Sequence, residues 1–304
     1  MPSRVEFWAG VYRLSDPKIS LASFSAMFLG AGAAAHDGRL SAPWLVLTVL
    51  GIWAIEIAKN ASGEIYDWDS GTDRLVAPQD RSPFSGGKRV LLDGLLTRRQ
   101  TADIALVGYF AGILAGVAIV RFREPEVLWL GVIGVACAFF YHAPPLKLSY
   151  RGLGELAVAF CYGPLICAGT YFVQRGSVRA PILLLSIPLG LLIAAFLWIN
   201  EFPDARADGE AGKRTLVVRL GKRRASRAYV ILLILAFAML ASLPLAGLPR
   251  GVWLGGIALL PAAWSARALL AEPENTPGLV PAQASALLAF LLLALGAGLG
   301  LLLF

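Results

Sequence analysis

Residues 181–214 read PILLLSIPLGLLIAAFLWINEFPDARADGEAGKR. The first part, 181–199, carries no charged residue and is long enough to cross a bilayer as a helix, which needs about 20 residues. Glu201, Asp204 and Asp208 follow at spacings of three and four, so one helix face presents all three carboxylates. We expect Pro203 in the first turn of that helix, where its missing N–H costs little. The stretch therefore predicts a membrane span that ends in an acidic helix face.

The rest of the chain repeats this apolar pattern. Hydrophobic residues make up 57% of the 304 residues and charged residues only 15%, too few to cover a soluble domain, which carries about 25%. We predict an all-α polytopic membrane protein of about nine transmembrane helices, forming a single domain over residues 1–304. The two weakest segments, 44–58 and 127–141, are expected to continue as helix beyond the bilayer. The nine segments are 19–35, 44–58, 102–120, 127–141, 154–173, 181–199, 228–246, 252–270 and 281–304.

The charged residues orient these spans. With a cytoplasmic N-terminus, most of the 27 Lys and Arg fall on the inner side, as the positive-inside rule expects. The outer side then holds Arg39, Arg121, Arg123, Arg175, Arg179 and Arg250. We expect a protein of the inner or plasma membrane with the N-terminus and acidic loops cytoplasmic and the C-terminus outside. Because the basic residues border spans, they indicate topology and not nucleic-acid binding.

Two long polar segments, 59–101 and 200–227, follow the second and sixth spans and differ from the short connections elsewhere. This placement suggests an internal duplication whose two acidic clusters face each other. Neighbouring carboxylates repel, and Mg²⁺ with a substrate phosphate would relieve that repulsion. Single acidic clusters are usually solvated helix ends, but two matching ones followed by basic residues predict a metal–diphosphate site. The candidate Mg²⁺ ligands are Glu64, Asp67, Asp73, Glu201, Asp204 and Asp208.

These motifs resemble those of the UbiA superfamily of intramembrane prenyltransferases, which has two Asp-rich motifs after the second and sixth of nine helices around a central cavity. Here they are GEIYD at 63–67 followed by Asp73, and EFPD at 201–204 followed by Asp208. The segments 67–73, 83–91, 150–174 and 200–221 are similar to the 1,4-dihydroxy-2-naphthoate polyprenyltransferases of menaquinone synthesis. Two departures stand out, since Gly63 replaces the family's usual Asn and glutamate leads both motifs.

The resemblance implies Mg²⁺-dependent transfer of a polyprenyl group from its diphosphate to an aromatic acceptor, with loss of the ring carboxylate in the naphthoate branch. It implies catalytic roles for Glu64, Asp67, Asp204 and Asp208. No obligate protein partner is evident. The implied substrate-binding residues are Asn60, Tyr141, Lys147, Arg151, Asn200, Lys213 and Arg214.

Other functions remain open at this stage. The acceptor could be a hydroxybenzoate, homogentisate, chlorin, haem or glycerol phosphate. A CDP-alcohol phosphotransferase needs one continuous Asp array, which this chain lacks. An ion-coupled transporter needs acids near the bilayer midplane. Glu56 is the one acid at the margin of a predicted span, and we expect it to pair structurally with Lys59 at i+3.

Overall fold

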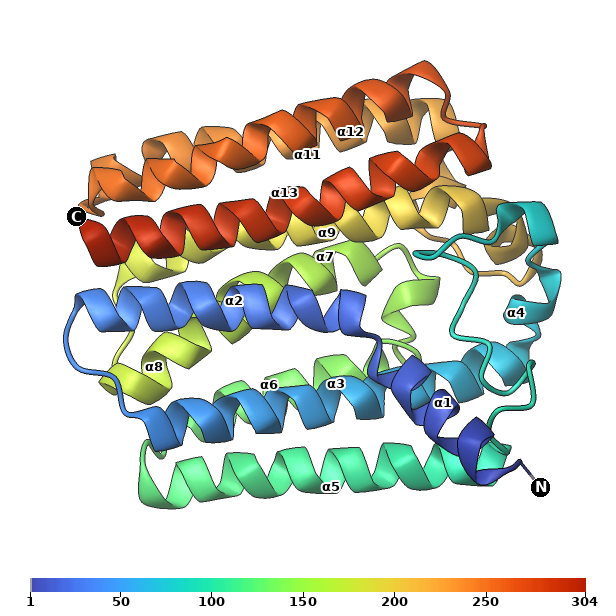
Figure 1. Ribbon diagram of the computed structural model, residues 1–304, viewed down its shortest axis with the longest axis horizontal. Helices are drawn as coiled ribbons and strands as arrows, with labels where there is room; N and C mark the ends of the chain where they lie inside the picture. The colour runs from blue at the N-terminus through green and yellow to red at the C-terminus, as the bar shows by residue number, and fades with distance from the viewer. Residues whose placement is uncertain (1) are drawn as a thin grey trace.

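The computed structural model describes residues 2–304, and all regular structure in that range is helical. Nine helical passes alternate in direction, which confirms the predicted class (Figure 1). Eight of them are long and apolar enough to cross a membrane. The passes are α2 (Pro17–His36), α3 (Ala42–Ser70), α5 (Arg98–Phe122), α6 (Val127–Phe140), α7–η3–α8 (Gly154–Phe160, Cys161–Ala168, Gly169–Arg175), α9 (Ala180–Glu210), α11 (Lys222–Ser242), η5–α12 (Arg250–Ala258, Leu259–Ala271) and α13 (Thr276–Leu303).

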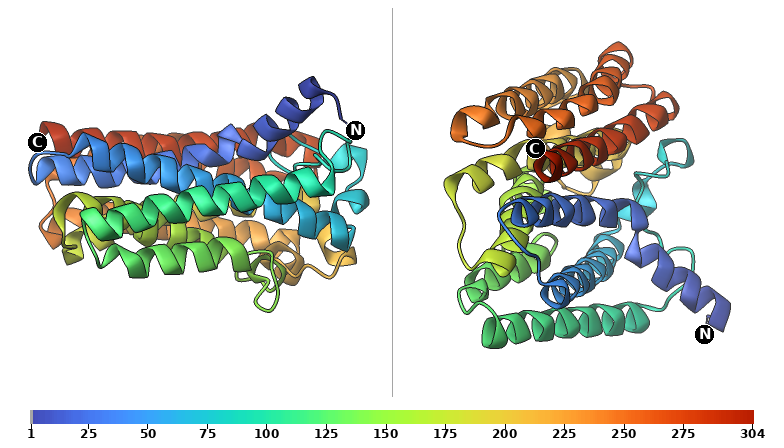
Figure 2. Two further views of the ribbon diagram at one scale, coloured as in Figure 1. Left: turned by 90° about the horizontal axis from the view of Figure 1, so that it is seen from below. Right: turned by 60° about the vertical axis from the view of Figure 1, so that its left-hand side comes forward.

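Short helices join these passes. Ser3 and Glu6 form a capping box that begins α1 (Arg4–Ser15) ahead of the first pass. The remaining short elements are α4 (Thr72–Leu75), η1 (Pro78–Asp80), η2 (Leu148–Tyr150), α10 (Leu216–Leu220) and η4 (Leu243–Ala246). Helix α1, the acidic ends of α3 and α9 and the long connection 76–97 lie at one end of the bundle, and the C-terminus lies at the other (Figures 1 and 2).

The two weak segments behave differently. Helix α3 continues past the predicted span to Ser70 and ends at Gly71, whose positive φ of 78° suits glycine. The expectation for 127–141 is wrong, because α6 stops at Phe140 and Tyr141 ends it. Pro144 and Pro145 follow within a turn, and the residue before a proline disfavours helical geometry. The fourth pass is thus only about 21 Å long.

The second acidic segment is not a new helix. Helix α9 runs without interruption from Ala180 to Glu210, so Pro203 lies deep in its interior and the expected first turn is wrong. Phe202 is fully buried in the main core together with Ile199. Packing of this turn against the bundle outweighs the hydrogen bond that proline removes. The carboxylates of the cluster are therefore carried on a rigid extension of a span.

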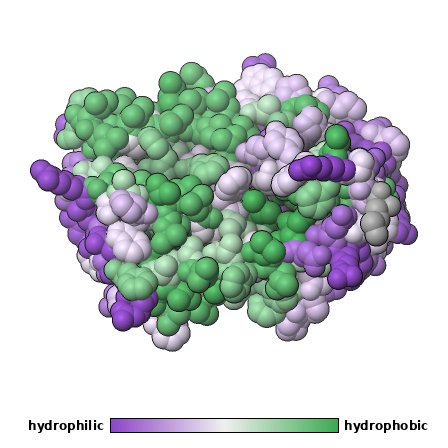
Figure 3. Space-filling model, turned by 60° about the horizontal axis from the view of Figure 1, so that its bottom comes forward, coloured by the Kyte–Doolittle hydropathy of each residue, from purple (hydrophilic) through white to green (hydrophobic). Residues whose placement is uncertain are grey.

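The core and the surface fit a membrane setting. The main core gathers α2, η3, α9, α11, η5–α12 and α13, where close contacts use small residues such as Gly251 of η5 against Gly300 of α13. Large apolar side chains on α5 point outward, including Leu106, which is 70% exposed. Figure 3 shows apolar side chains gathered in a broad middle region of one face, with hydrophilic ones toward the ends. Such a surface belongs in lipid.

Candidate active site

One large cavity of about 1470 Å³ lies inside the bundle. The end of the cavity beside the acidic ends of α3 and α9 is polar, and both acidic clusters line it. An apolar arm extends between α3, α5, α6 and α8, where Ile113, Val117 and Leu128 line the cavity with accessible side chains. Helix α5 also carries exposed apolar side chains away from the cavity, such as Leu106, so the arm lies beside the lipid-facing surface of the bundle. This chamber is larger than most ligand pockets, which measure roughly 300–1,000 Å³.

The first acidic cluster comes from the end of α3 and from α4. Glu64 and Asp67 lie one turn apart and both line the cavity, as the spacing predicted. The Tyr150 hydroxyl donates a hydrogen bond to Asp67 Oδ1 at 3.1 Å. The turn at Gly71 directs Asp73 back into the same space. Burial, with the nearby Asp67 and Glu64 carboxylates, raises the pKa of Asp73 to about 8.

The connection between residues 76 and 97 closes over this end of the cavity. The Gly86 N–H donates to Asp204 Oδ2 at 3.1 Å, and the Leu91 N–H donates to Glu64 Oε1 at 2.9 Å. Gly87 has a φ of 75°, and a Cβ there would come within 2.2 Å of an Asp73 carboxylate oxygen. One loop thus contacts acids of both clusters through its backbone.

The second acidic cluster lies on α9 and reaches the cavity from the opposite wall. Glu201, Asp204 and Asp208 all line it. Lys213 follows α9 and its Nζ lies 3.4 Å from Asp208 Oδ1. Burial alone would lower the pKa of Lys213, but Asp208 and Asp67 raise it well above its usual value, so this half-buried lysine stays charged.

The donor set fits magnesium bound together with a substrate. No group of three His, Cys, Asp or Glu residues between 2 and 304 already forms a metal-binding cluster. Mg²⁺ needs only one or two carboxylates, because water and substrate phosphates complete its shell. Glu201 Oε2, Asp204 Oδ1 and Asn200 Oδ1 are buried atoms without a hydrogen-bond partner in the described structure. Such oxygens are suited to accept a cation or a donor that a ligand brings.

The structure brings most of the predicted substrate-binding residues to the cavity. Asn60, Tyr141, Asn200 and Lys213 line it. Asn60 also donates from Nδ2 to the Leu14 carbonyl at 2.9 Å, which ties α3 to α1. Three basic residues do not line the cavity, namely Lys147, Arg151 and Arg214.

Each of those three basic residues has another setting. Arg151 donates to the Pro145 carbonyl at 2.8 Å. Lys147 lies over the Tyr150 ring, 5.2 Å from its centroid, and Arg214 is exposed. None of the three therefore reaches the space between the acidic clusters.

Gly63 has a structural explanation. A Cβ at this position would lie 2.6 Å from Cε1 of His142, so the imidazole ring occupies the space beside the motif. His142 lines the cavity, and burial lowers its pKa to about 4, which keeps the ring neutral. Nothing in the pattern around His142 indicated this contact, because it joins residues 79 positions apart. Gly63, where the family usually has Asn, was the sequence feature that could have indicated this contact.

Sequence reasoning also missed polar residues deeper in the cavity. Glu56 and Lys59 both line it, and the expected ion pair between them does not form. Glu56 instead accepts hydrogen bonds from Ser23 and Tyr162. An acid at the margin of a predicted span was the available signal, but the i+3 spacing to Lys59 favoured a local pair.

Comparison with known proteins identifies the family. Residues 23–278 match the UbiA prenyltransferase family, which covers most of the chain. The chain belongs to the UbiA prenyltransferase family. It is 31% identical to 1,4-dihydroxy-2-naphthoate octaprenyltransferase of Mycobacterium tuberculosis over 71% of this chain and 72% of that protein. It is 26% identical to the Bacillus subtilis enzyme of the same name over 75% and 70% of the two chains. The protein is therefore a prenyltransferase of the membrane.

Solved structures support the same fold. A UbiA homolog from Aeropyrum pernix K1 superposes with a TM-score of 0.65 at 21% identity, covering 91% of this chain and 96% of that one. A UbiA homolog from Archaeoglobus fulgidus, bound to GPP and Mg²⁺, superposes with a TM-score of 0.59 at 15% identity over 95% and 99% of the chains. At these identities the likeness concerns the fold.

Proposed function

We propose that this UbiA prenyltransferase transfers a polyprenyl group from polyprenyl diphosphate to 1,4-dihydroxy-2-naphthoate in a Mg²⁺-dependent reaction. The observation that carries the proposal is the cavity itself, which joins two facing acidic clusters to one long apolar arm. The polar end suits a metal diphosphate, and the arm suits an isoprenoid tail. The naphthoate octaprenyltransferases among its relatives support this acceptor class.

In this proposal the residues Glu64, Asp67, Asp73, Glu201, Asp204 and Asp208 hold the metal. Bound Mg²⁺ supplies Lewis-acid stabilisation of the departing diphosphate. Lys213 adds positive charge at the same end of the cavity, where Asp208 holds its ammonium. An A. fulgidus homolog of the same fold is bound to GPP and Mg²⁺, which supports a metal diphosphate as the ligand class.

The apolar arm has a second task in this scheme. Cleavage of the allylic C–O bond releases diphosphate and leaves a carbocation that water would capture, so the reacting carbon must stay dry until the aromatic ring attacks it. The ring then loses its carboxyl group as carbon dioxide, which restores its aromaticity. Ile52, Ile55 and Leu165 line the cavity beyond the acidic end and exclude water there. In this scheme a tail longer than the arm extends beyond it into lipid.

The test is a product assay with purified protein in detergent, Mg²⁺, a labelled polyprenyl diphosphate and a panel of aromatic acceptors. We expect a prenylated naphthoquinol, diphosphate release, and loss of both when EDTA removes the metal. Prenylation of only a different acceptor would move the enzyme to another pathway. No product and no diphosphate release with any acceptor would contradict the proposed function.

A further inference from the structure

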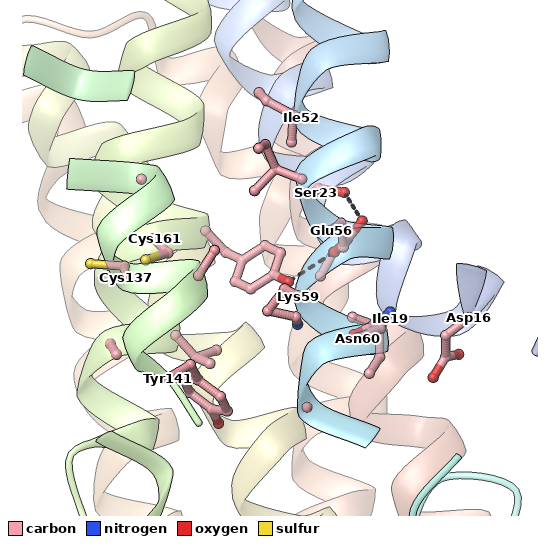
Figure 4. Close-up of a pocket in the computed structure, with 18 of the residues that line it drawn as sticks. Asp16, Ile19, Ser23, Ile52, Glu56, Lys59, Asn60, Cys137, Tyr141 and Cys161 are labelled. Atoms are coloured by element: carbon pink, nitrogen blue, oxygen red, sulfur yellow. Dashed lines mark hydrogen bonds between the residues drawn. The ribbon is translucent and has the colours of Figure 1, made fainter. Parts of the chain in front are cut away.

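Glu56 is fixed in the cavity wall inside the α3 span (Figure 4). Glu56 is 5% exposed, and both of its carboxylate oxygens accept hydrogen bonds. Ser23 Oγ on α2 donates to Oε2 at 2.8 Å, and the Tyr162 hydroxyl on η3 donates to Oε1 at 2.8 Å. Three separate passes thus meet at this carboxylate, and two hydroxyl donors satisfy it.

Lys59 lies one turn further along α3 and faces the open space. Figure 4 shows its side chain between Glu56 and Tyr141, and its Nζ is 6.0 Å from the centroid of the Tyr141 ring. It makes no ion pair with any residue from 2 to 304. An ammonium group has three donors, and no carboxylate among residues 2–304 pairs with this one. A ligand anion would complete this site.

The position of Lys59 matches the place where an acceptor must lie. With a rise of 1.5 Å per residue, it sits about 8 Å from Glu64 and about 12 Å from Asp67 along the axis of α3. A diphosphate between the acidic clusters directs its reacting carbon toward the apolar arm. The aromatic acceptor must contact that carbon, which places it between Asp67 and Lys59. The Tyr141 ring borders the same space and offers a face for stacking.

We propose that Lys59 binds the carboxylate of a hydroxylated aromatic acid, with Tyr141 against its ring, and so determines the acceptor specificity of this enzyme. The inference rests on the proposed function, because it names the contact by which the same cavity selects its acceptor. Glu56 acts as a positioning residue. Its bonds to Ser23 and Tyr162 keep it from pairing with Lys59, so the ammonium remains available to the ligand.

The experiment compares wild type with Lys59→Met in the purified full chain. We expect KM for 1,4-dihydroxy-2-naphthoate to rise about 10- to 100-fold, the loss typical of a hydrogen bond to a charged group. KM for the prenyl diphosphate should differ from the wild-type value by no more than about twofold, because the diphosphate binds between the acidic clusters and not at Lys59. With 1,4-dihydroxynaphthalene, which lacks the carboxylate, the two proteins should give the same KM. Lys59→Arg should retain most of the acceptor affinity.

A matched control and a binding titration complete the design. Lys222→Met makes the same change at a lysine that pairs with Glu274 away from the cavity, and should leave both KM values unchanged. Fluorescence titration of each protein with the naphthoate alone measures acceptor affinity without turnover. An equal loss for the acid and its uncharged analogue, or a rise in KM for the diphosphate alone, would overturn the inference.

The two proposals fail in different ways. If wild type releases no diphosphate with any acceptor, the proposed function fails, and the titration still decides whether Lys59 binds the acid. If wild type uses 1,4-dihydroxynaphthalene with the same KM as the naphthoate, prenyl transfer stands and the role of Lys59 is wrong.

Discussion

The unusual residue of the first acidic motif, Gly63, is explained by its neighbour. His142 fills the volume that a side chain at Gly63 would need, so the two positions form one packing unit at the wall of the cavity. The ring is neutral because burial lowers its pKa to about 4. Glu64 and Asp67 therefore keep their places on α3, while the His142 ring fills the space between α3 and the end of α6.

This packing unit predicts the effect of Gly63→Ala. The added methyl group would lie 2.6 Å from the imidazole and should destabilise the protein by about 1–3 kcal/mol, as overpacking usually does. His142→Ala should relieve the clash, so the double variant should unfold at a higher temperature than Gly63→Ala alone. Thermal unfolding in detergent measures both. Strict additivity of the two changes would contradict the contact.

At the scale of elements, the sequence predicted the acidic helix faces correctly but not the loop that covers them. The three-residue spacing of Glu64 and Asp67 places both carboxylates on one face, and α3 does extend to Ser70. The shape of residues 76–97 depends instead on contacts with Asp204 and Asp73, which lie on other elements. The sequence of the loop does not indicate which distant residues it contacts. The continuity of α9 past Pro203 also depends on tertiary contacts, because Phe202 packs in the main core. The local sequence therefore did not predict it.

The loop makes a paired prediction at two glycines. Gly87 and Gly94 have similar positive φ values of 75° and 69°, but only Gly87 lies against Asp73. Alanine costs about the same backbone strain at both positions. We expect Gly87→Ala to raise KM for the prenyl diphosphate several-fold beyond any effect of Gly94→Ala, measured by diphosphate release. Equal effects at the two glycines would show that the loop does not shape the diphosphate end.

The same loop is held to the first pass by an ion pair. Lys88 bonds to Asp16, which links α1 to α2 and is 7% exposed. Burial alone would raise the pKa of Asp16, but Lys88 lowers it below its usual value. Because the folded pKa is the lower one, this pair stabilises the fold above the unfolded pKa, and the benefit disappears as the pH falls through the folded value.

Asp16→Asn should therefore lower stability at neutral pH by about 1–3 kcal/mol, between the values for exposed and buried pairs. The difference from wild type should shrink as the pH falls below about 4. Chemical unfolding in detergent across this range measures it. A difference that is independent of pH would mean that the asparagine disturbs packing and not the ion pair.

At the scale of the whole molecule, we propose that the nine passes form one domain with a defined orientation. Helix α13 packs against α2, so the last pass closes onto the first (Figure 2). Helix α1 and both acidic clusters lie at one end and the C-terminus at the other. Together with the distribution of Lys and Arg, this supports a cytoplasmic active-site end.

Reporter fusions test this orientation. Alkaline phosphatase, which is active only outside the cytoplasm, should be active when fused after Phe304 and inactive when fused after Ser15. Green fluorescent protein should show the reverse pattern. Phosphatase activity at Ser15 together with fluorescence at Phe304 would invert the proposed topology.

The central claim is that two acidic clusters, distant in sequence, serve one metal–diphosphate site, and a double-mutant cycle tests it most directly. Diphosphate release should be measured for Asp67→Asn, Asp204→Asn and the double variant, with Asp69→Asn as control, since Asp69 pairs with Arg98 outside the cavity. We expect each single variant to lose about 100-fold or more, the double variant little further, and the control to match wild type. Near-wild-type release by either single variant would contradict a shared site.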